Sequence, residues 1–138
     1  MSYANLTGAS LDNADLSGAD LTYSILKTAN LGNADLSNAN LGNADLSNAN
    51  LNSINATSTG LVGANMTGVN LTGAGFSNAN LSGANMTGVN LTDADFSNTN
   101  LRGAILTGVN LTGVYWSSTT CPDGTNSDSD GNTCAGHI

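Results

Sequence analysis

Positive charge is nearly absent from this sequence, which has 2 Lys and Arg residues against 10 acidic residues and a net charge of −8. A protein that binds nucleic acid directly needs a basic surface, and Lys27 and Arg102 alone do not supply one. No apolar run approaches the roughly 18 residues of a membrane span, so we expect no such span. The chain has one His and no evident buried acid pair, so we expect neither a catalytic site nor enzymatic activity.

Aromatic residues (4%) and charged residues (9%) are also scarce, and there is a single Pro. Asn, Ser, Thr and Gly supply the polarity, and such a composition on its own is typical of disordered tracts. A regular apolar pattern argues against disorder, because a regular stripe of apolar residues can be buried. The 138 residues are enough for one domain.

A large apolar residue recurs at every fifth position from Leu6 to Trp116, with Ala56 as the one small exception. A small apolar residue, usually Ala, precedes this central residue by two positions, and Asn or Asp lies between them. Residues five apart on a helix are rotated by about 140°, and in a straight strand they alternate between faces, so neither element fits. The pattern instead predicts a short extended segment, with the small and central residues facing inward, followed by a Ser/Thr–Gly/Asn corner.

A longer repeat of twenty residues is superimposed on the five-residue repeat, since Ala84–Gly103 nearly repeats Ala64–Gly83. Self-similarity at a fixed period is the signature of a repeat architecture, and this period predicts that four fives close one coil. The central residues then form four interior columns over nearly six coils. These columns are Leu6, Leu26, Leu46, Met66, Met86, Leu106; Leu11, Leu31, Leu51, Leu71, Leu91, Leu111; Leu16, Leu36, Ala56, Phe76, Phe96, Trp116; and Leu21, Leu41, Leu61, Leu81, Leu101. The aromatic residues of the third column should stack on one another.

The fives Ala14-Asp15-Leu16-Ser17-Gly18 and Ala34-Asp35-Leu36-Ser37-Asn38 resemble the A(D/N)LXX motif of pentapeptide repeat proteins. The resemblance covers about four-fifths of the chain and implies an all-β fold, a right-handed quadrilateral parallel β-helix. We expect this β-helix over residues 1–116 and a C-terminal cap or tail over residues 117–138. A solenoid end needs such a cover, and no equivalent segment precedes Leu6.

The weakest part of the repeat is Asn52–Gly60, where Ala56 takes a central position and Ile54 takes the preceding small position. One interpretation is an exchange of large for small that conserves core volume. The other is a local bulge or loop with both neighbouring fives in phase.

The C-terminal segment contains both cysteines, Cys121 and Cys134, on either side of a polar loop. A disulfide between them is our prediction, with free thiols or a metal pair including His137 as alternatives. Because disulfides persist in oxidising compartments, the pair favours a periplasmic, lumenal or secreted location. No signal peptide is visible, so a cytoplasmic location also fits.

Within that loop, Asn126, Asp128 and Asp130 alternate and are followed by Gly131, as at the start of a calcium-binding loop. Asn takes the first ligand position, and His137 stands where a bidentate Glu belongs. The alternative is a polar, turn-rich cap without a cofactor.

The function that this sequence favours is a non-catalytic structural or protein-interaction module whose partner the sequence does not name. The bare first coil additionally predicts a homodimer formed head to head.

Two alternatives depend on the outward-facing rows of the β-helix. Asp15, Asp35 and Asp95 lie on one side, and family members that protect bacterial type II topoisomerases from quinolones resemble DNA in width and charge. Rows of Thr on adjacent sides would suit an ice-binding surface; these rows are Thr67, Thr87, Thr107 and Thr72, Thr92, Thr112.

Overall fold

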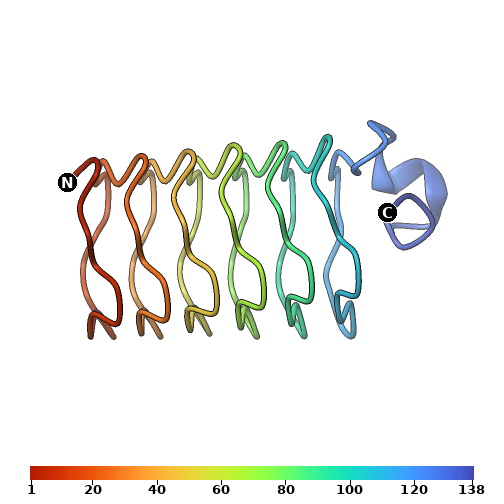
Figure 1. Cartoon of the computed structure of the whole chain (residues 1–138). Helices are drawn as coiled ribbons and strands as arrows, with labels where there is room; N and C mark the ends of the chain where they lie inside the picture. The colour runs from red at the N-terminus through yellow and green to blue at the C-terminus, as the bar shows by residue number, and fades with distance from the viewer.

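A computed structural model shows a straight rod of stacked coils, with the C-terminal segment lying over one end (Figure 1). The structure describes residues 1–138, except for the side chain of Asp130. The only helix in the described chain is a short 3-10 helix, η1, at Ser127–Asp130. The coils are joined by single parallel bridges between residues twenty positions apart, so this is the expected right-handed quadrilateral β-helix.

Most corners are four-residue turns closed by a backbone hydrogen bond, such as Ala9 N–H to the Leu6 carbonyl at 3.0 Å. The third residue of the turn has a positive φ, as at Gly8 (67°) and Asn13 (58°). Gly and Asn tolerate this left-handed backbone better than other residues, which explains their recurrence at this position. The corner residues therefore set the direction in which the chain bends after every extended segment.

The backbone of one coil is paired with the next on all four sides. In the second coil, Asn30 N–H donates to the Ala9 carbonyl (2.9 Å), and its carbonyl accepts from Leu11 N–H (2.7 Å). The bridges continue in this way from Asn5–Ile25 to Asn100–Thr120. These hydrogen bonds run along the rod, so each coil is the template for its neighbours.

The core lies inside the coils and is built from the four predicted columns. Phe76 and Phe96 are fully buried, and their ring centroids are 5.1 Å apart. Trp116 stacks on Phe96 at 5.4 Å, which confirms the predicted aromatic stack. Leu26, Leu46 and their counterparts in the middle coils are also fully buried.

The segment Asn52–Gly60 is a regular part of the coil rather than a bulge. Ile54 (2% exposed) and Ala56 (0% exposed) both point into the core, so the volume-exchange interpretation is correct. Thr59 takes the next small position, and its hydroxyl donates to the Leu36 carbonyl at 2.7 Å. Thr99 and Thr119 make the same contact with the carbonyls of Phe76 and Phe96, so three buried hydroxyls link successive coils.

The β-helix continues past Trp116, where the apolar repeat was expected to stop. Thr119 and Cys121 occupy the small and central positions of one further side, and both are fully buried. Leu101 N–H donates to the Thr120 carbonyl (2.8 Å), as the regular pairing requires. The interpretation from sequence ended too early because Thr and Cys stand there in place of Ala and Leu.

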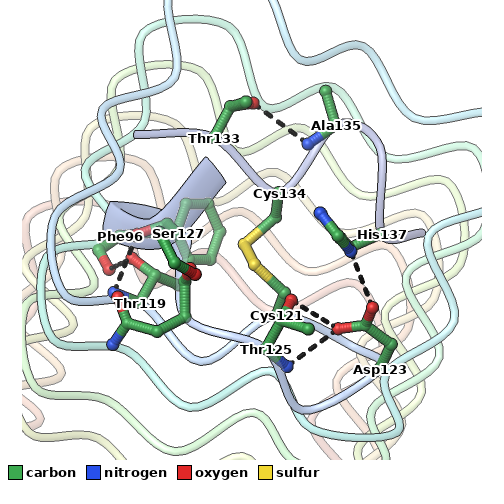
Figure 2. The surroundings of a disulfide bond; sticks show 12 residues. Phe96, Thr119, Cys121, Asp123, Thr125, Ser127, Thr133, Cys134, Ala135 and His137 are labelled. Carbon is green, nitrogen blue, oxygen red and sulfur yellow. Dashed lines mark hydrogen bonds and ion pairs between the residues drawn. A yellow bond between two sulfur atoms is a disulfide. The ribbon is translucent and has the colours of Figure 1, made fainter. Parts of the chain in front are cut away.

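The C-terminal segment folds back over this last side (Figure 2). A disulfide joins Cys121 to Cys134, as the sequence predicts, with their Cα atoms 5.4 Å apart. Thr119 N–H donates to the Ser127 hydroxyl at 3.1 Å, and Ser127 N–H donates to the Thr119 carbonyl at 2.9 Å. The cap therefore uses the backbone edge of the fourth side.

At the opposite end, no described segment covers the first coil. Leu6, Leu11 and Leu16 are only partly buried, whereas their equivalents in the second coil have 0–1% exposure. Tyr3 and Tyr23 stack on the outside of this end, with ring centroids 5.2 Å apart. No helix in the described chain is long and apolar enough to cross a membrane.

Candidate functional site

The most regular outer surface is a row of asparagines on the second side of the rod. We call this side the asparagine face; its row comprises Asn30, Asn50, Asn70, Asn90 and Asn110. Asn50 Nδ2 donates to Asn30 Oδ1 at 2.9 Å, and Asn110 Nδ2 donates to Asn90 Oδ1 at 3.2 Å. The side-chain amides thus form a ladder that follows the backbone ladder beneath it, except that Asn90 Nδ2 donates to the Thr72 hydroxyl instead of to Asn70.

Each asparagine of the C-terminal half also holds a threonine beside it. Asn90 Oδ1 accepts from the backbone amide of Thr92 (3.2 Å) and from its hydroxyl (2.7 Å). Asn110 makes the same two bonds with Thr112, at 3.1 and 2.7 Å. Because these side chains are held by neighbours on two sides, little rotamer freedom remains to be lost when another molecule binds.

The asparagine face is also nearly uncharged in a protein of net charge −8. Its second row consists of Asp12, Gly32, Asn52, Thr72, Thr92 and Thr112, so Asp12 is the one charged residue of the two rows. Removing an amide or hydroxyl from water costs less than removing a carboxylate. This side of the rod is therefore the one most easily desolvated by a docking protein.

The predicted acidic row lies on the third side, but it is not continuous. Asp15, Asp35 and Asp95 share one line with Asn55 and Gly75. Hydrogen bonds from the Ser17 hydroxyl and amide lower the pKa of Asp15 below its usual range. Burial raises the pKa of Asp95, but bonds from the hydroxyl and amide of Ser97 outweigh it and leave that pKa lowered as well.

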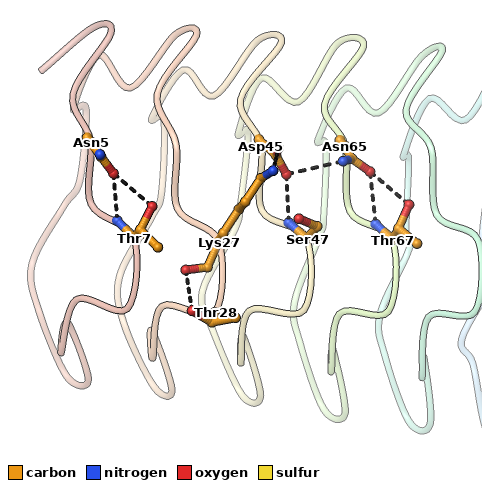
Figure 3. Close-up of polar contacts among 8 residues, drawn as sticks. All are labelled: Asn5, Thr7, Lys27, Thr28, Asp45, Ser47, Asn65 and Thr67. Atoms are coloured by element: carbon orange, nitrogen blue, oxygen red, sulfur yellow. Dashed lines mark hydrogen bonds and ion pairs between the residues drawn. The ribbon is translucent and has the colours of Figure 1, made fainter.

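The predicted threonine row on the first side, Thr67, Thr87 and Thr107, is limited to the later coils, because earlier coils have other residue types at the same position (Figure 3). The hydroxyl of Thr67 donates to Asn65 Oδ1 at 2.8 Å, and Lys27 and Ser47 occupy equivalent positions of earlier coils. Lys27 Nζ lies 3.1 Å from a carboxylate oxygen of Asp45. An ion pair thus lies in the earlier coils in line with this row, whereas no ionic group lies within the row from Asn30 to Asn110.

The calcium candidates lie in the cap and have other partners there. Asn126 Oδ1 accepts from Asp128 N–H at 2.9 Å and so caps η1. The carboxylate of Asp128 accepts from the amide (2.6 Å) and hydroxyl (2.9 Å) of Ser118. The side chain of Asp130 lies outside the described residues. Calcium binding stays a prediction of the sequence, tested by a thermal melt with and without chelator.

His137 and Asp123 form a polar contact near the disulfide. His137 Nδ1 lies 2.7 Å from Asp123 Oδ2. Hydrogen bonds from the hydroxyl and amide of Thr125, and then from His137, lower the pKa of Asp123 to about 2. Sequence reasoning missed this pair, although Asp123 follows Cys121 closely in the chain and His137 follows Cys134.

Neither a metal cluster nor a cavity stands out in the described part of the protein. No three of its His, Cys, Asp or Glu side chains are close enough to hold a metal ion, and its surface has no pocket. The outer faces and the two ends of the rod are therefore the candidate sites.

Comparison with known proteins gives one family. The family model of pentapeptide repeats matches with 8 copies, over residues 1–38, 34–73 and 74–113. No curated protein matched.

Among solved structures, a pentapeptide repeat protein from the thylakoid lumen of Arabidopsis thaliana has 32% identity and a TM-score of 0.66. The match covers 67% of this chain and 65% of that protein, so this chain matches less than two thirds of that protein's length. HetL, involved in heterocyst differentiation regulation in the cyanobacterium Nostoc sp. strain PCC 7120, has 29% identity and a TM-score of 0.41, with coverage of 91% and 73%. QnrB1, a plasmid-mediated fluoroquinolone resistance protein, has 26% identity and a TM-score of 0.37, with coverage of 88% and 70%.

Proposed function

The chain belongs to the pentapeptide repeat family, and on this premise we propose that it is a non-catalytic module that binds a protein partner on its asparagine face. The observation that carries the proposal is the amide ladder on this face, which is almost free of charge. It bonds Asn70 to Asn50 and Asn50 to Asn30, and Asn110 to Asn90, and between these two stretches Asn90 bonds to Thr72. An ordered polar face binds with a small loss of side-chain entropy, and its amides offer both donors and acceptors.

Two matched double variants test this role in an affinity capture from the source cells. Thr72→Lys with Thr92→Lys places two charges on the asparagine face, and Val62→Lys with Ser82→Lys places two on the fourth side, at equivalent positions. We expect the first pair to abolish retention of a partner that the unmodified chain and the second pair both retain. Equal retention by both variants, or no specific retention by the unmodified chain, would contradict the proposal.

The alternative function, a DNA mimic that acts on bacterial type II topoisomerases, requires a continuous acidic side. The interruption of the acidic row at Asn55 and Gly75 is why we place it second. A gyrase supercoiling assay separates the two functions. Inhibition of supercoiling or protection from a quinolone at micromolar protein favours the mimic, and no effect favours the interaction module.

We also propose that the module works in an oxidising compartment. The Cys121–Cys134 disulfide supports this location, and so does the similarity to a thylakoid lumen protein. Rapid alkylation of thiols in intact source cells tests it. Blocked cysteines support an oxidising compartment, and fully alkylated cysteines contradict it.

A second copy of the chain is a further partner that we propose, because the first coil exposes its backbone edge and part of its core. Sedimentation across a wide concentration range should show a monomer–dimer equilibrium. A monomer at every concentration would contradict self-association without affecting the proposal for the asparagine face.

A further inference from the structure

The cap consists of two parts that are attached to the rod in different ways. The first part, residues 117–128, contains an antiparallel hairpin that is held by backbone pairing. Thr120 pairs with Asn126 in an antiparallel bridge. The carboxylate of Asp128 adds two hydrogen bonds, from the amide and the hydroxyl of Ser118. The hairpin is therefore attached to the fourth side of the rod by non-covalent bonds of its own.

The second part, residues 131–138, lacks such pairing, and we call it the latch. A backbone hydrogen bond from His137 N–H to the Cys134 carbonyl (2.9 Å) lies within it. Ala135 N–H donates to the Thr133 hydroxyl at 3.0 Å, which is also an internal bond. Within the described chain, no backbone group of the latch bonds to the hairpin or to the rod. The attachment of the latch therefore depends on its side chains.

Two side chains of the latch reach the hairpin (Figure 2). Cys134 forms the disulfide with Cys121 and is fully buried, whereas Ala135 and Ile138 of the latch are exposed. His137 contacts Asp123, a residue whose side chain is 43% exposed. An ion pair at such an exposed position contributes little to stability, because water screens it. The disulfide is therefore the main attachment of the latch.

The latch also covers part of the interior of the rod. Cys121 takes a central position of the fourth side, and together with Cys134 it belongs to the buried core. The Cα atoms of the two residues are 5.4 Å apart, so Cys134 lies against Cys121 where another coil would otherwise cover it. Moving the latch away would expose the Cys121 side chain at the end of the core.

We propose that the latch is a redox-controlled cover, held closed by the Cys121–Cys134 disulfide and released by reduction, while the hairpin and the rod keep their structure. After reduction, one buried thiol and one exposed ion pair are left to order the whole latch. The conformational entropy that the released residues gain exceeds what these two contacts supply.

The reduction requires a dithiol and a local movement of the latch. Both sulfur atoms are buried, and a segment without backbone pairing opens more easily than the paired hairpin does. A thiolate of the dithiol then attacks Cys134 Sγ, and the Cys121 sulfur leaves as a thiolate and takes a proton from water. The second thiol of the reductant displaces the Cys134 sulfur, which gives a cyclic disulfide and the second protein thiol.

This device is independent of the partner proposed for the asparagine face. In an oxidising compartment the latch is closed, and in a reducing compartment it is open. The same chain would therefore present two different C-terminal surfaces, one with a covered core and one with an accessible Cys121 thiol.

Backbone order parameters from ¹⁵N relaxation of the full chain, before and after reduction with dithiothreitol, test the release. On reduction, we expect the values of residues 131–136 to fall from about 0.85 to below about 0.6, while Asn126 and Thr99 keep theirs. Cys134→Ser should show the low values without reductant, and dithiothreitol should not change them. An ordered latch in the reduced protein, or loss of order in the rod as well, would overturn the proposal.

Alkylation of the reduced, folded protein by iodoacetamide is a second measurement. Cys134 should react about as fast as it does in urea, because a released segment no longer shields its thiol. Protection of Cys134 under these conditions would contradict the release. Asp123→Asn is the matched control, since it weakens the contact with His137 and keeps the disulfide. Its latch should stay ordered when oxidised, and disorder there would show that the disulfide is not the main attachment.

Discussion

Replacing Phe96 tests the internal stack on which the C-terminal half of the rod depends. Phe96 is fully buried between Phe76 (5.1 Å) and Trp116 (5.4 Å). Each aromatic pair adds about 0.5–1.5 kcal/mol beyond area burial, so Phe96→Leu, which loses two pairs, should cost about 1–3 kcal/mol. Leu36 is buried in the same column, which shows that Leu fits this position. Phe96→Ala also leaves a cavity and should cost about 3–5 kcal/mol.

Urea unfolding followed by tryptophan fluorescence and far-ultraviolet circular dichroism measures these costs. Met86→Leu is the control, because Met86 is equally buried in the first column and the change conserves volume, at a cost below about 1.5 kcal/mol. Phe76→Leu loses one aromatic pair and should fall between the control and Phe96→Leu. If Phe96→Leu costs no more than Met86→Leu, the stack does not contribute as argued.

Three further predictions concern acid, the cap and the buried hydroxyls. The folded-state pKa of Asp123 is about 2, below the unfolded value of about 3.9, so its stabilisation is complete above about pH 5 and is lost as the pH falls toward 2. Thermal melts should show this loss, and Asp123→Asn should make it smaller; an unchanged acid profile would contradict the assignment. Cys134→Ser opens a loop with a sequence separation of 13 and should lower the free energy of unfolding in urea by about 3 kcal/mol relative to the oxidised unmodified chain. The same variant should match the reduced unmodified chain, and a stability equal to that of the oxidised chain would show that the disulfide does not hold the cap. Thr99→Val removes the donor to the buried Phe76 carbonyl and should cost about 1–3 kcal/mol, whereas Thr92→Val on the surface should cost less; equal costs would contradict the role of the buried hydroxyl.

The interior of this protein could be predicted from sequence because a single physical rule generates it. Inward positions recur every five residues and identical coils every twenty, so the spacing of Phe76, Phe96 and Trp116 is enough to place them in one column. For Ile54 and Ala56 the sequence left two interpretations, and the structure shows the one that conserves volume. Periodic burial is a strong signal, since each coil supports the position of the next.

Contacts that break the period could not be predicted in the same way. The bonds from Thr59, Thr99 and Thr119 to the preceding coil depend on a hydroxyl at a position where Ala is usual. In the cap, the carboxylate of Asp128 accepts a hydrogen bond from Ser118 N–H, a contact that local spacing does not indicate. The Tyr3–Tyr23 stack has a detectable signal, because the two residues are twenty positions apart, but both lie at outward corners that the pattern of burial does not cover.

The asparagine ladder is visible as a row in the sequence, but its hydrogen bonds are not. Whether Asn90 donates to Asn70 or to Thr72 depends on side-chain rotation, and the structure shows the bond to the Thr72 hydroxyl at 3.0 Å. The scarcity of charge around the ladder also becomes meaningful only when the four sides are compared. A periodic sequence therefore reveals which residues share a side, and the structure reveals which of those sides is ordered.

Because four five-residue segments complete one coil, the number of residues between two points of the rod fixes how far one is rotated about the rod axis relative to the other. Deleting Ala84–Gly103 would shorten the rod by one coil and leave the cap at the same rotation about the rod axis relative to Tyr3. Deleting five residues instead would rotate the cap by a quarter-turn about the rod axis. Every asparagine of the ladder after the deletion would then lie on a neighbouring side of the rod. The number of residues thus sets the rotation between the two ends of the rod as well as its length. A small deletion would change the relative orientation of the ends without unfolding the coils between them.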